Sequence, residues 1–449
     1  MIQLSGKKVA VLGLGIEGKD LCQFLLKKDA QVTVFDQKEQ SDLEEDYWVF
    51  KKQGINFSLG KDYLKNRLLG FEIIFRSPGF RRLIPEIVEA EKRGSTISSS
   101  TKLFFDLCPG RIIGVTGTKG KGTTTTLIYQ ILKNDGQGAF LAGNIGGPVL
   151  SLLPKIKSED WAVLELSSFQ LQDMEKSPHL AVVLFISSEH LDYHQDTKEY
   201  IEAKSQIVRH QKRDDLTVLN ADDATSCSFA DFTQADVFYY SRHQKVNGSY
   251  VVSGKLYLFN QLVGEVDQLQ IRGQHNWENV CASIIAGHLA GASLSSIKKA
   301  VFSFKGLEHR LELVRKFNGV DFYNDSFSTT PETAIAAVSA FSEPIILIAG
   351  GSEKGSDFTQ LGKEISRSSV KSLILLGEMA DRIKKASQKA GFEGKIIFRP
   401  KSIKTAVEAA YKEADKGEVV LLSPACASFD MFKNYKERGK QFKHHVQAL

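Results

Sequence analysis

Short runs of nearly continuous apolar residues alternate with helical patterns along the whole chain. Such runs predict buried parallel strands, because a strand covered by helices on both faces shows no polar alternation. The clearest runs lie at residues 9–12, 31–35, 71–75, 111–115, 161–165, 180–186, 344–351, 372–377, 395–398 and 418–423. Residues 236–272 instead alternate between apolar and polar positions, which predicts an antiparallel hairpin region. The pattern as a whole predicts an α/β fold with mostly parallel sheets.

A glycine-rich turn follows the first predicted strand. Gly13-Leu-Gly-Ile-Glu-Gly18 precedes a helical stretch, and the second strand ends at Asp36. Glycines at this spacing let the backbone approach a pyrophosphate, and the later acid can bind ribose hydroxyls. Another strand ends at Ser77-Pro-Gly79, which is either a plain turn or a ligand-binding turn at a strand end. These features predict a Rossmann-like domain over residues 1–107.

A second glycine-rich loop, Gly114-Val-Thr-Gly-Thr-Lys-Gly-Lys-Gly-Thr-Thr-Thr-Thr126, lies between a strand and a helical pattern. Glycine lets backbone N–H groups close around an anion, and the helix end adds partial positive charge. Lys121 can reach the outer phosphates of a nucleoside triphosphate, and a nearby hydroxyl can hold Mg²⁺. The standard pattern has a hydroxyl directly after the lysine. Gly122 stands there instead, so Thr123 is the nearest candidate.

Polar residues collect where later strands end. Glu165 closes one apolar run, and a carboxylate beside a phosphate loop is well placed to ligate Mg²⁺. Residues 187–194 are rich in acids and imidazoles but fit no zinc spacing. We therefore predict a central P-loop ATPase-like domain with a mostly parallel sheet over residues 108–309. The strand-then-loop units beyond it predict a second Rossmann-like domain over residues 310–449.

Composition narrows the function classes. A chain of 449 residues is long enough for about three domains. The net charge of +5 comes from nearly balanced acids and bases, which argues against a nucleic-acid surface. No apolar run approaches the roughly 18 residues of a membrane helix, and the chain start shows no signal-peptide pattern. Five scattered cysteines without a Cys-x-x-Cys pair favour a reducing cytoplasm.

These motifs, in this order and over nearly the whole chain, resemble those of the Mur ligases. Besides the two glycine-rich loops and Ser77-Pro-Gly79, the matching segments are Gly143-Asn-Ile-Gly-Gly147, Glu165-Leu-Ser-Ser-Phe-Gln170, His190-Leu-Asp-Tyr-His194, Ala203-Lys204, His275-Asn276, Glu308-His-Arg310, Asn324-Asp-Ser326 and Leu422-Ser-Pro-Ala-Cys-Ala-Ser-Phe-Asp430. Each segment alone is a weak signal, whereas the collinear set is strong.

The resemblance implies an ATP-dependent, ADP-forming carboxylate–amine ligase of cytoplasmic peptidoglycan precursor synthesis, a route that serves cell-wall biogenesis, cell shape and division. D-glutamate would be joined to UDP-N-acetylmuramoyl-L-alanine through an acyl phosphate. The first domain would bind the UDP substrate, the second ATP with Mg²⁺, and the third glutamate. A monomer is expected, with no membrane insertion and no nucleic-acid partner.

The resemblance also assigns roles to individual residues. The catalytic set is Lys121, Glu165, His190 and Lys204. The magnesium ligands are Thr123, Glu165, His190 and Lys204, with Lys204 carbamylated by carbon dioxide. The ATP contacts are Gly117, Thr118, Lys119, Gly120, Lys121, Gly122, Thr123, Asn276, Asn279, Arg310 and Asp325. The contacts with the UDP substrate are Gly15, Ile16, Glu17, Asp36, Ser77, Gly79, Asn144, Ser167, Gln170 and His190. The glutamate contacts are Thr329, Lys354, Ser428, Phe429 and Tyr435.

Three residues depart from the family pattern. Lys119 stands where the family loop usually has Asn, and Gly122 replaces a hydroxyl residue. Phe327 stands where the D-glutamate ligases usually carry lysine, which leaves the same ligation with L-glutamate open.

Three further hypotheses remain beside the ligase. A folylpolyglutamate synthase would use the same chemistry, but the extra N-terminal glycine-rich domain argues against it. An NAD(P)-dependent oxidoreductase could use the turn at residues 13–18, but it leaves Lys121 and Glu165 without a role. A non-catalytic nucleotide-binding scaffold would not need the four catalytic candidates.

Overall fold

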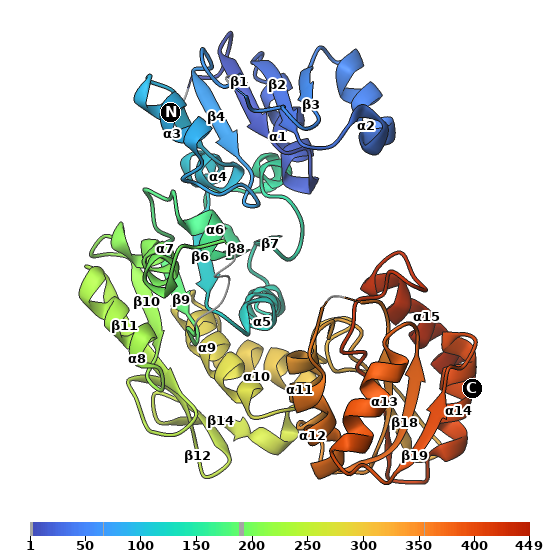
Figure 1. Cartoon of the computed structure of the whole chain (residues 1–449). Helices are drawn as coiled ribbons and strands as arrows, with labels where there is room; N and C mark the ends of the chain where they lie inside the picture. The colour runs from blue at the N-terminus through green and yellow to red at the C-terminus, as the bar shows by residue number, and fades with distance from the viewer. Residues whose placement is uncertain (1–2, 66, 188–192, 354) are drawn as a thin grey trace. The chain divides into compact units, whose positions relative to one another are not determined.

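The computed structural model describes residues 3–65, 67–187, 193–353 and 355–449. The chain forms two units, which are treated separately below. The first contains residues 1–266 and 278–301, and the second contains residues 267–277 and 302–449. Each unit is built around α/β sheets, so the predicted fold class is confirmed (Figure 1).

The first sheet has the strand order β3-β2-β1-β4-β5, and all of its pairs are parallel. Its strands are β1 (Lys8–Leu12), β2 (Gln31–Asp36), β3 (Asn56–Leu59), β4 (Ile73–Arg76) and β5 (Thr96–Ser98). The accompanying helices are α1 (Ile16–Leu26), α2 (Gln40–Lys52), α3 (Pro85–Lys92) and α4 (Ser100–Leu107). Apolar residues of α1, α2 and α4 pack on one face of the sheet and those of α3 on the other.

The second sheet, in the described part of the chain, has the order β14-β13-β12-β11-β10-β9-β6-β8-β7. Its strands are β6 (Arg111–Thr116), β7 (Ala139–Gly143), β8 (Trp161–Glu165), β9 (Leu180–Val183), β10 (Leu216–Asn220), β11 (Asp236–Ser241), β12 (Gly248–Val252), β13 (Lys255–Leu258) and β14 (Gln261–Glu265). The antiparallel prediction is confirmed for β12, β13 and β14. It is wrong for β11, which pairs in parallel with β10 and β12 because the main sheet extends that far.

The helices that follow the strands of the second sheet are α5 (Lys121–Asn134), α6 (Ser168–Leu171), α7 (Thr197–Arg209), α8 (Ala224–Ser228), α9 (His275–Leu289) and α10 (Leu294–Ser303). Short 3-10 helices lie at η1 (Leu150–Lys155), η2 (Phe229–Phe232) and η3 (Val266–Gln268). Helix α5 begins at Lys121, after the loop of residues 117–120 that follows β6, so the predicted order of strand, glycine loop and helix is present.

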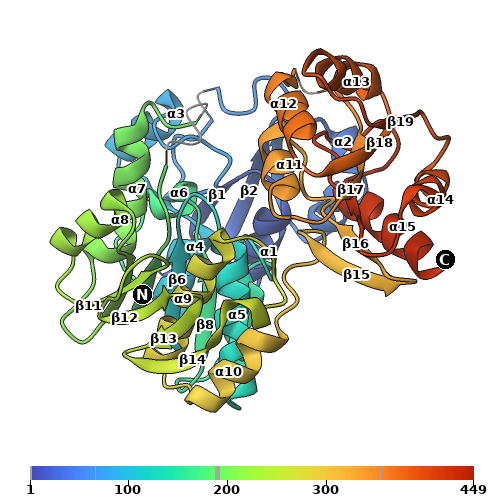
Figure 2. The same cartoon turned by 90° about the horizontal axis from the view of Figure 1, so that it is seen from below.

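The third sheet forms the second unit and has the order β15-β16-β20-β17-β18-β19. Its strands are β15 (Glu312–Phe317), β16 (Val320–Asn324), β17 (Ile345–Gly350), β18 (Val370–Leu376), β19 (Lys395–Phe398) and β20 (Val419–Leu422), and only the β15–β16 pair is antiparallel among those described. Helices α11 (Pro331–Val338), α12 (Thr359–Arg367) and α13 (Ala380–Lys389) cover one face. Helices α14 (Ile403–Glu413) and α15 (Tyr435–Gln447) cover the other (Figure 2).

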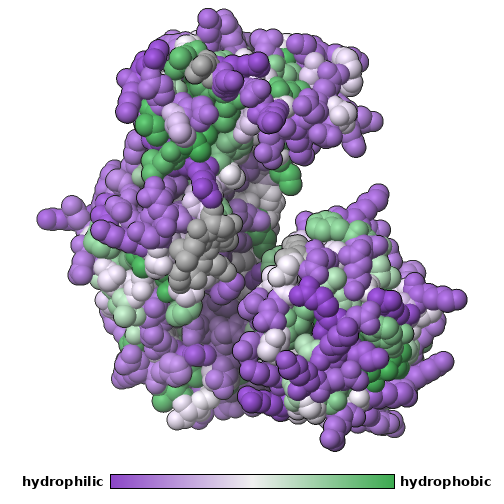
Figure 3. Space-filling view, in the orientation of Figure 1, coloured by the Kyte–Doolittle hydropathy of each residue, from purple (hydrophilic) through white to green (hydrophobic). Residues whose placement is uncertain are grey.

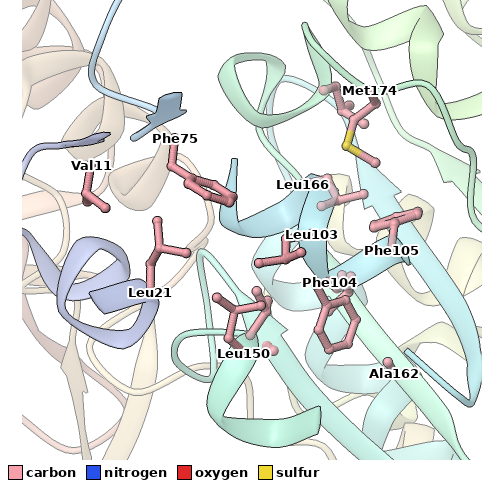
Figure 4. Packing of buried hydrophobic residues seen from close by; sticks show 14 of the residues in the cluster. Val11, Leu21, Phe75, Leu103, Phe104, Phe105, Leu150, Ala162, Leu166 and Met174 are labelled. Atoms are coloured by element: carbon pink, nitrogen blue, oxygen red, sulfur yellow. The ribbon is translucent and has the colours of Figure 1, made fainter. Parts of the chain in front are cut away.

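One apolar cluster joins the first two sheets within the first unit. Val11, Leu21 and Phe75 come from the first sheet and α1, whereas Leu103 and Leu150 come from α4 and η1 (Figure 4). The same cluster continues to β8 and the segment after α6. Burial of this continuous apolar surface stabilises the two sheets against each other.

The three predicted domains correspond to the three sheets, but their boundaries at residues 107 and 309 stay a prediction. The division into two units joins the first two sheets and assigns residues 267–277 and 302–309 to the second unit. Within the described residues, no helix is both long and apolar enough to cross a bilayer. Hydrophilic residues cover most of the face of each unit seen in Figure 3.

Gly18, in the first turn of α1, packs closely against the first glycine turn, and a substitution there tests this packing. A Cβ on Gly18 would lie 2.0 Å from the backbone oxygen of Gly13, whereas a Cβ on Gly15 would meet nothing within 4 Å. Overpacking of this kind typically destabilises a protein by about 1–3 kcal/mol. We expect Gly18→Ala to lower the thermal midpoint of the first unit clearly, and Gly15→Ala to change it little, in differential scanning calorimetry. Equal midpoints for the two variants would contradict the packing described here.

Candidate functional site

The loop between β6 and α5 has the form of an anion cradle. Gly117 and Gly120 have φ angles of 152° and 85°, in the region that favours glycine. Gly120 is the N-cap of α5 and offers no side-chain cap, so the first backbone N–H groups of the helix face the loop. Such a helix end attracts negatively charged groups such as phosphate.

Packing around the loop leaves no room for larger residues. A Cβ on Gly117 would lie 2.6 Å from Leu184 Cβ, and a Cβ on Gly120 would lie 2.1 Å from Asn279 Oδ1. Thr118 is held by its N–H, which donates to the Phe185 carbonyl at 2.8 Å. The loop is therefore fixed before any ligand arrives, which lowers the entropic cost of binding.

Two lysines from different helices meet at this loop. Lys121 Nζ donates to the carbonyl oxygens of Gly117 and Thr118, at 2.9 and 3.0 Å. Lys204, on α7, is 1% exposed, and its Nζ also donates to the Gly117 oxygen at 2.9 Å. The Lys204 amine lies 4.6 Å from the centre of the Tyr200 ring. The structure thus brings two of the four predicted catalytic residues to one carbonyl group, while Lys119 is exposed on the loop.

Glu165 ends β8, the strand beside β6. It is half-buried and lies in register with Val115 of β6 and Gly143 of β7. Asn144 follows β7, is exposed, and donates its N–H to the Glu165 carbonyl at 3.3 Å. Thr123, in the first turn of α5, is 5% exposed. His190 lies outside the described residues.

The residues described here fit a magnesium ion of the phosphate-bound kind. In the part of the chain that the structure describes, no group of three or more His, Cys, Asp or Glu side chains could by itself hold a metal. Mg²⁺ usually takes one or two protein oxygen ligands and completes its shell with water and substrate phosphates. The Thr123 hydroxyl and the Glu165 carboxylate are oxygen donors of this type.

The first glycine turn is organised by the acid that ends β2. Asp36 is 8% exposed, and its carboxylate accepts hydrogen bonds from the N–H groups of Leu14 and Lys38, at 2.8 and 3.0 Å. These bonds orient the turn, and helix α1 then begins at Ile16, which is 75% exposed. Gly15 caps this helix without a side chain, so its open N–H groups form a second anion-binding helix end.

Gln170, on α6, links the segment that follows β8 to the first glycine turn. Its Nε2 donates to Glu17 Oε1 at 3.0 Å, and its Oε1 accepts from the Ser167 N–H at 3.0 Å. Burial raises the pKa of Glu17 above its usual range. Ser77 and Gly79 follow β4 and are half-buried and exposed, respectively. The predicted contacts for the UDP substrate thus come from both sheets of the first unit.

In the second unit, Asp325 is buried where β16 ends. Its two carboxylate oxygens accept from the Leu311 N–H at 3.1 Å and the Ser423 hydroxyl at 2.8 Å. Burial raises the pKa of Asp325 to about 6, and the hydrogen bonds and the nearby Arg310 oppose that shift only in part. A buried carboxylate kept at such a cost is characteristic of a functional site.

Phe327 lies between two predicted substrate contacts. The Arg310 guanidinium carbon is 4.4 Å from the centre of the Phe327 ring, and the Tyr435 ring meets Phe327 edge-on at 5.2 Å. Phe327 is 41% exposed, so part of its side chain remains accessible to solvent. Asn276, on α9, donates its side-chain amide to the Arg272 carbonyl at 2.6 Å.

Sequence reasoning missed Arg438, which holds the predicted glutamate-binding loops together. Its guanidinium is fully buried and donates to the carbonyls of Ser326, Cys426 and Ala427. Burial lowers the pKa of Arg438 to about 10. The pattern of α15 marks no special arginine, so the sequence carried no local signal for this role.

The remaining glutamate candidates lie near those loops. Ser428 is 2% exposed, Phe429 is 70% exposed and Thr329 is half-buried just before α11. Phe429 donates its N–H to the Ser352 hydroxyl at 3.2 Å. Lys354 lies outside the described residues.

The buried charge of Asp325 has a measurable effect on stability. Because its folded-state pKa of about 6 exceeds the ordinary value of 3.8, the folded chain binds this proton more tightly than the unfolded chain. The stabilising protonated form is present at low pH and is lost as the pH rises through about 6. We expect Asp325→Asn to raise the free energy of unfolding of the second unit by about 1–3 kcal/mol at pH 8.

The difference in free energy of unfolding between Asp325→Asn and wild type should shrink as the pH falls from 6 to 4. Urea unfolding at several pH values measures it. Asp381→Asn is the matched control, because Asp381 forms an exposed ion pair with Arg399. A stabilisation by Asp325→Asn that does not change with pH would contradict the burial of this charge.

Comparison with known proteins agrees with this geometry. The model described as "Mur ligase MurD-like, N-terminal domain" matches residues 7–99, "Mur ligase middle domain" matches 115–287, and "Mur ligase, glutamate ligase domain" matches 309–426. The UDP-N-acetylmuramoylalanine–D-glutamate ligase of Acetivibrio thermocellus is 42% identical, covering 100% of this chain and 97% of that protein. The ligase of the same name from Symbiobacterium thermophilum is 41% identical, covering 99% and 98%.

Solved structures share the fold. The UDP-N-acetylmuramate–alanine ligase of Thermotoga maritima superposes with a TM-score of 0.62 at 17% identity, covering 98% of this chain and 99% of that chain. The MurF ligase of Thermotoga maritima, solved in complex with ADP, gives a TM-score of 0.57 at 17% identity, covering 99% and 96%. The chain therefore belongs to the Mur ligase family, as the order of its motifs predicts.

Proposed function

We propose that this chain joins glutamate to UDP-N-acetylmuramoyl-L-alanine, using ATP and forming ADP and phosphate. The names of relatives about 40% identical over nearly their full lengths support this reaction. The structural observation that supports it best is the meeting of Lys121 and Lys204 at the Gly117 carbonyl, inside the glycine cradle. We also propose three domains, which bind the UDP substrate (residues 1–107), ATP (108–309) and glutamate (310–449).

The chemistry follows from what the substrates lack. A carboxylate does not react with an amine at neutral pH, because its leaving group would be oxide. In the proposed first step, a carboxylate oxygen of the substrate forms a bond to the γ-phosphorus of ATP as the bond to ADP breaks. The amine of glutamate then attacks the acyl phosphate, and the tetrahedral intermediate expels phosphate to leave an amide. A protein catalyses such phosphoryl transfer mainly through positioning and charge neutralisation.

Lys121 is the residue to which we assign charge neutralisation at the outer phosphates. Its amine already lies over the loop, where it donates to the backbone carbonyls of Gly117 and Thr118. The N–H groups at the start of α5 would hold phosphate oxygens alongside it. The other proposed ATP contacts are Gly117, Thr118, Lys119, Gly120, Gly122, Thr123, Asn276, Asn279, Arg310 and Asp325.

Magnesium would be held by Thr123 and Glu165, with His190 and a carbamylated Lys204 as further ligands. When bound, the ion would supply positive charge that neutralises the phosphates and stabilises the transferring phosphoryl group. Carbamylation joins the Lys204 nitrogen to the carbon of carbon dioxide and releases two protons from the ammonium group, so a buried cation becomes an anionic oxygen donor. The burial of Lys204 beside Gly117 supports this assignment.

For the UDP substrate we propose contacts from both sheets of the first unit. Gly15, Ile16 and Glu17 would face the diphosphate at the start of α1, and Asp36, Ser77 and Gly79 the uridine. Asn144 would lie near the uridine, Ser167 and Gln170 would contact the muramoyl-alanine part, and His190 would lie near the acyl phosphate. The open N–H groups of α1 and the exposure of Ile16 support a ligand at this turn.

For glutamate we propose Thr329, Lys354, Ser428, Phe429 and Tyr435. The relatives' names specify D-glutamate. The stack of Phe327 on Arg310 and Tyr435 gives this pocket a ring where a lysine is usual, so L-glutamate is the second candidate. We also propose that the enzyme acts as a monomer in the cytoplasm. Its five cysteines are all unpaired, which agrees with a reducing compartment.

A phosphate-release assay tests the reaction. We expect release only when ATP, UDP-N-acetylmuramoyl-L-alanine and glutamate are all present, with parallel arms for D- and L-glutamate. Lys121→Ala should lower the rate by at least about 1,000-fold, because it removes the charge at the outer phosphates. Lys119→Ala, which changes an exposed lysine of the same loop, should lower it far less. Phosphate release that ignores the muramoyl substrate would refute the proposal.

Carbamylation of Lys204 is tested by ¹³C NMR in ¹³C-bicarbonate. We expect a carbamate carbon signal in the wild-type protein and none in Lys204→Arg, because a guanidinium does not form the carbamate. Lys198→Arg is the matched control, since Lys198 is exposed on the same helix. Persistence of the signal in Lys204→Arg would assign the carbamate to another residue.

A further inference from the structure

Arg76 is a buried cation that connects the first two sheets. It is the last residue of β4 and is 2% exposed. Its Nε and Nη2 donate to the Asp173 carboxylate at 2.9 and 2.5 Å, and Nη2 also donates to the Phe169 carbonyl at 2.9 Å. Its Nη1 donates to the Phe80 carbonyl at 2.6 Å and to the Tyr193 hydroxyl at 2.7 Å.

Asp173 binds both ends of the turn that follows β4. One of its carboxylate oxygens accepts from Arg76, and the other accepts from Arg82 Nε at 2.8 Å. Arg82 in turn donates to Glu91 on α3 at 2.6 Å. The turn between these two arginines contains Ser77 and Gly79, the proposed uridine contacts. The carboxylate side chain is itself only 8% exposed.

The network also reaches the segment around α6, which contains the proposed contacts with the muramoyl-alanine part of the substrate. Phe169 and Gln170 lie in α6, and Ser167 is the N-cap of that helix. Asp173 lies two residues beyond its end. Gln170 reaches back to Glu17 on α1 through its own hydrogen bond. Arg76 therefore lies between residues proposed to hold the two ends of one substrate.

Apolar packing alone would not fix this relationship. The cluster that includes Phe75 and Leu166 stabilises the two sheets against each other, but apolar contacts have little directional preference. The Arg76–Asp173 pair is directional because Nε and Nη2 both donate to one carboxylate oxygen, and burying it requires good geometry because both charges lose their water. A buried pair of this kind is therefore suited to setting register rather than to adding stability.

We propose that Arg76, paired with Asp173, is a positioning residue. It sets the distance between the uridine-binding turn at residues 77–79 and the muramoyl-alanine contacts Ser167 and Gln170. This inference rests on the proposed function. It adds that affinity for the UDP substrate depends on a link between two sheets that does not itself touch the substrate.

The test uses the full chain with two conservative substitutions, Arg76→Lys and Asp173→Asn. Lysine keeps the charge but cannot make the fork of bonds, and asparagine keeps the size but removes the charge. We expect each variant to raise the KM for UDP-N-acetylmuramoyl-L-alanine about tenfold while leaving the KM for ATP and for glutamate within about twofold. The double variant should be little worse than either single one, because both remove the same link.

Arg93→Ala is the matched control, since it breaks an exposed ion pair with Glu89 in the same part of the chain. It should leave all three KM values unchanged. If the three KM values of Arg76→Lys rise together, or none of them changes, the positioning role is wrong. If Arg76→Lys does not fold, Arg82→Gln replaces it, because Arg82 is more exposed and holds only the far end of the turn. The same selective rise in KM, of smaller size, is expected.

Calorimetric titration with UDP-N-acetylmuramoyl-L-alanine separates this inference from the proposed function. If the wild-type protein binds the compound but forms no product, the proposed reaction fails. The dissociation constants of wild type and Arg76→Lys then still decide the role of Arg76, with a tenfold weakening in its favour and equal constants against it. If the wild-type protein does not bind the compound, both are overturned.

Discussion

The carbonyl of Gly117 is the point on which the central site depends. Two lysines from α5 and α7 donate to it, and the backbone can present it only because Gly117 has a φ angle of 152° against Leu184. Any larger residue would push the loop from the start of α5 and separate the two amines. The cradle therefore holds the Lys121 amine and the open N–H groups of α5 in place before a phosphate enters, which is how a protein lowers the cost of phosphoryl transfer.

Each of the three sheets has features suited to a charged ligand where one of its strands ends. In the first two, a strand ends in a glycine turn and the next helix begins without a side-chain cap. The third sheet has buried charges at this place instead of a glycine turn. Asp325 directly follows β16, and Arg438 donates to the backbone of the neighbouring loops. Burial raises the pKa of Asp325 and lowers that of Arg438, and both shifts favour the neutral form of the side chain. Burial of such charges costs stability, which is a pattern expected where a site needs them.

Most of the fold could be predicted from sequence because its signals are local. Apolar runs gave the parallel strands, and the glycine spacing gave both turns and the start of α5. The error at β11 arose because alternation of apolar and polar residues does not reveal whether a strand pairs in parallel or antiparallel with its neighbours. Arg76 and Arg438 could not be predicted, since their partners Asp173 and Ser326 lie 97 and 112 residues away in the chain. From composition alone Lys204 would be a surface lysine, and only the family resemblance singled it out. Its burial results from the packing of α7 beside β6. Asp36 was predicted from its place at the end of β2, whereas its hydrogen bond from the Leu14 N–H is visible only in the structure.

The central claim is that an inert carboxylate is activated by transfer of a phosphoryl group. The most direct measurement starts from UDP-N-acetylmuramoyl-L-alanine with both carboxylate oxygens replaced by ¹⁸O, incubated with ATP and glutamate. An acyl phosphate gives one ¹⁸O in the released inorganic phosphate for each amide formed, and the other stays in the amide. Mass spectrometry that finds the label in AMP, or no label in phosphate while product accumulates, would contradict the proposed chemistry.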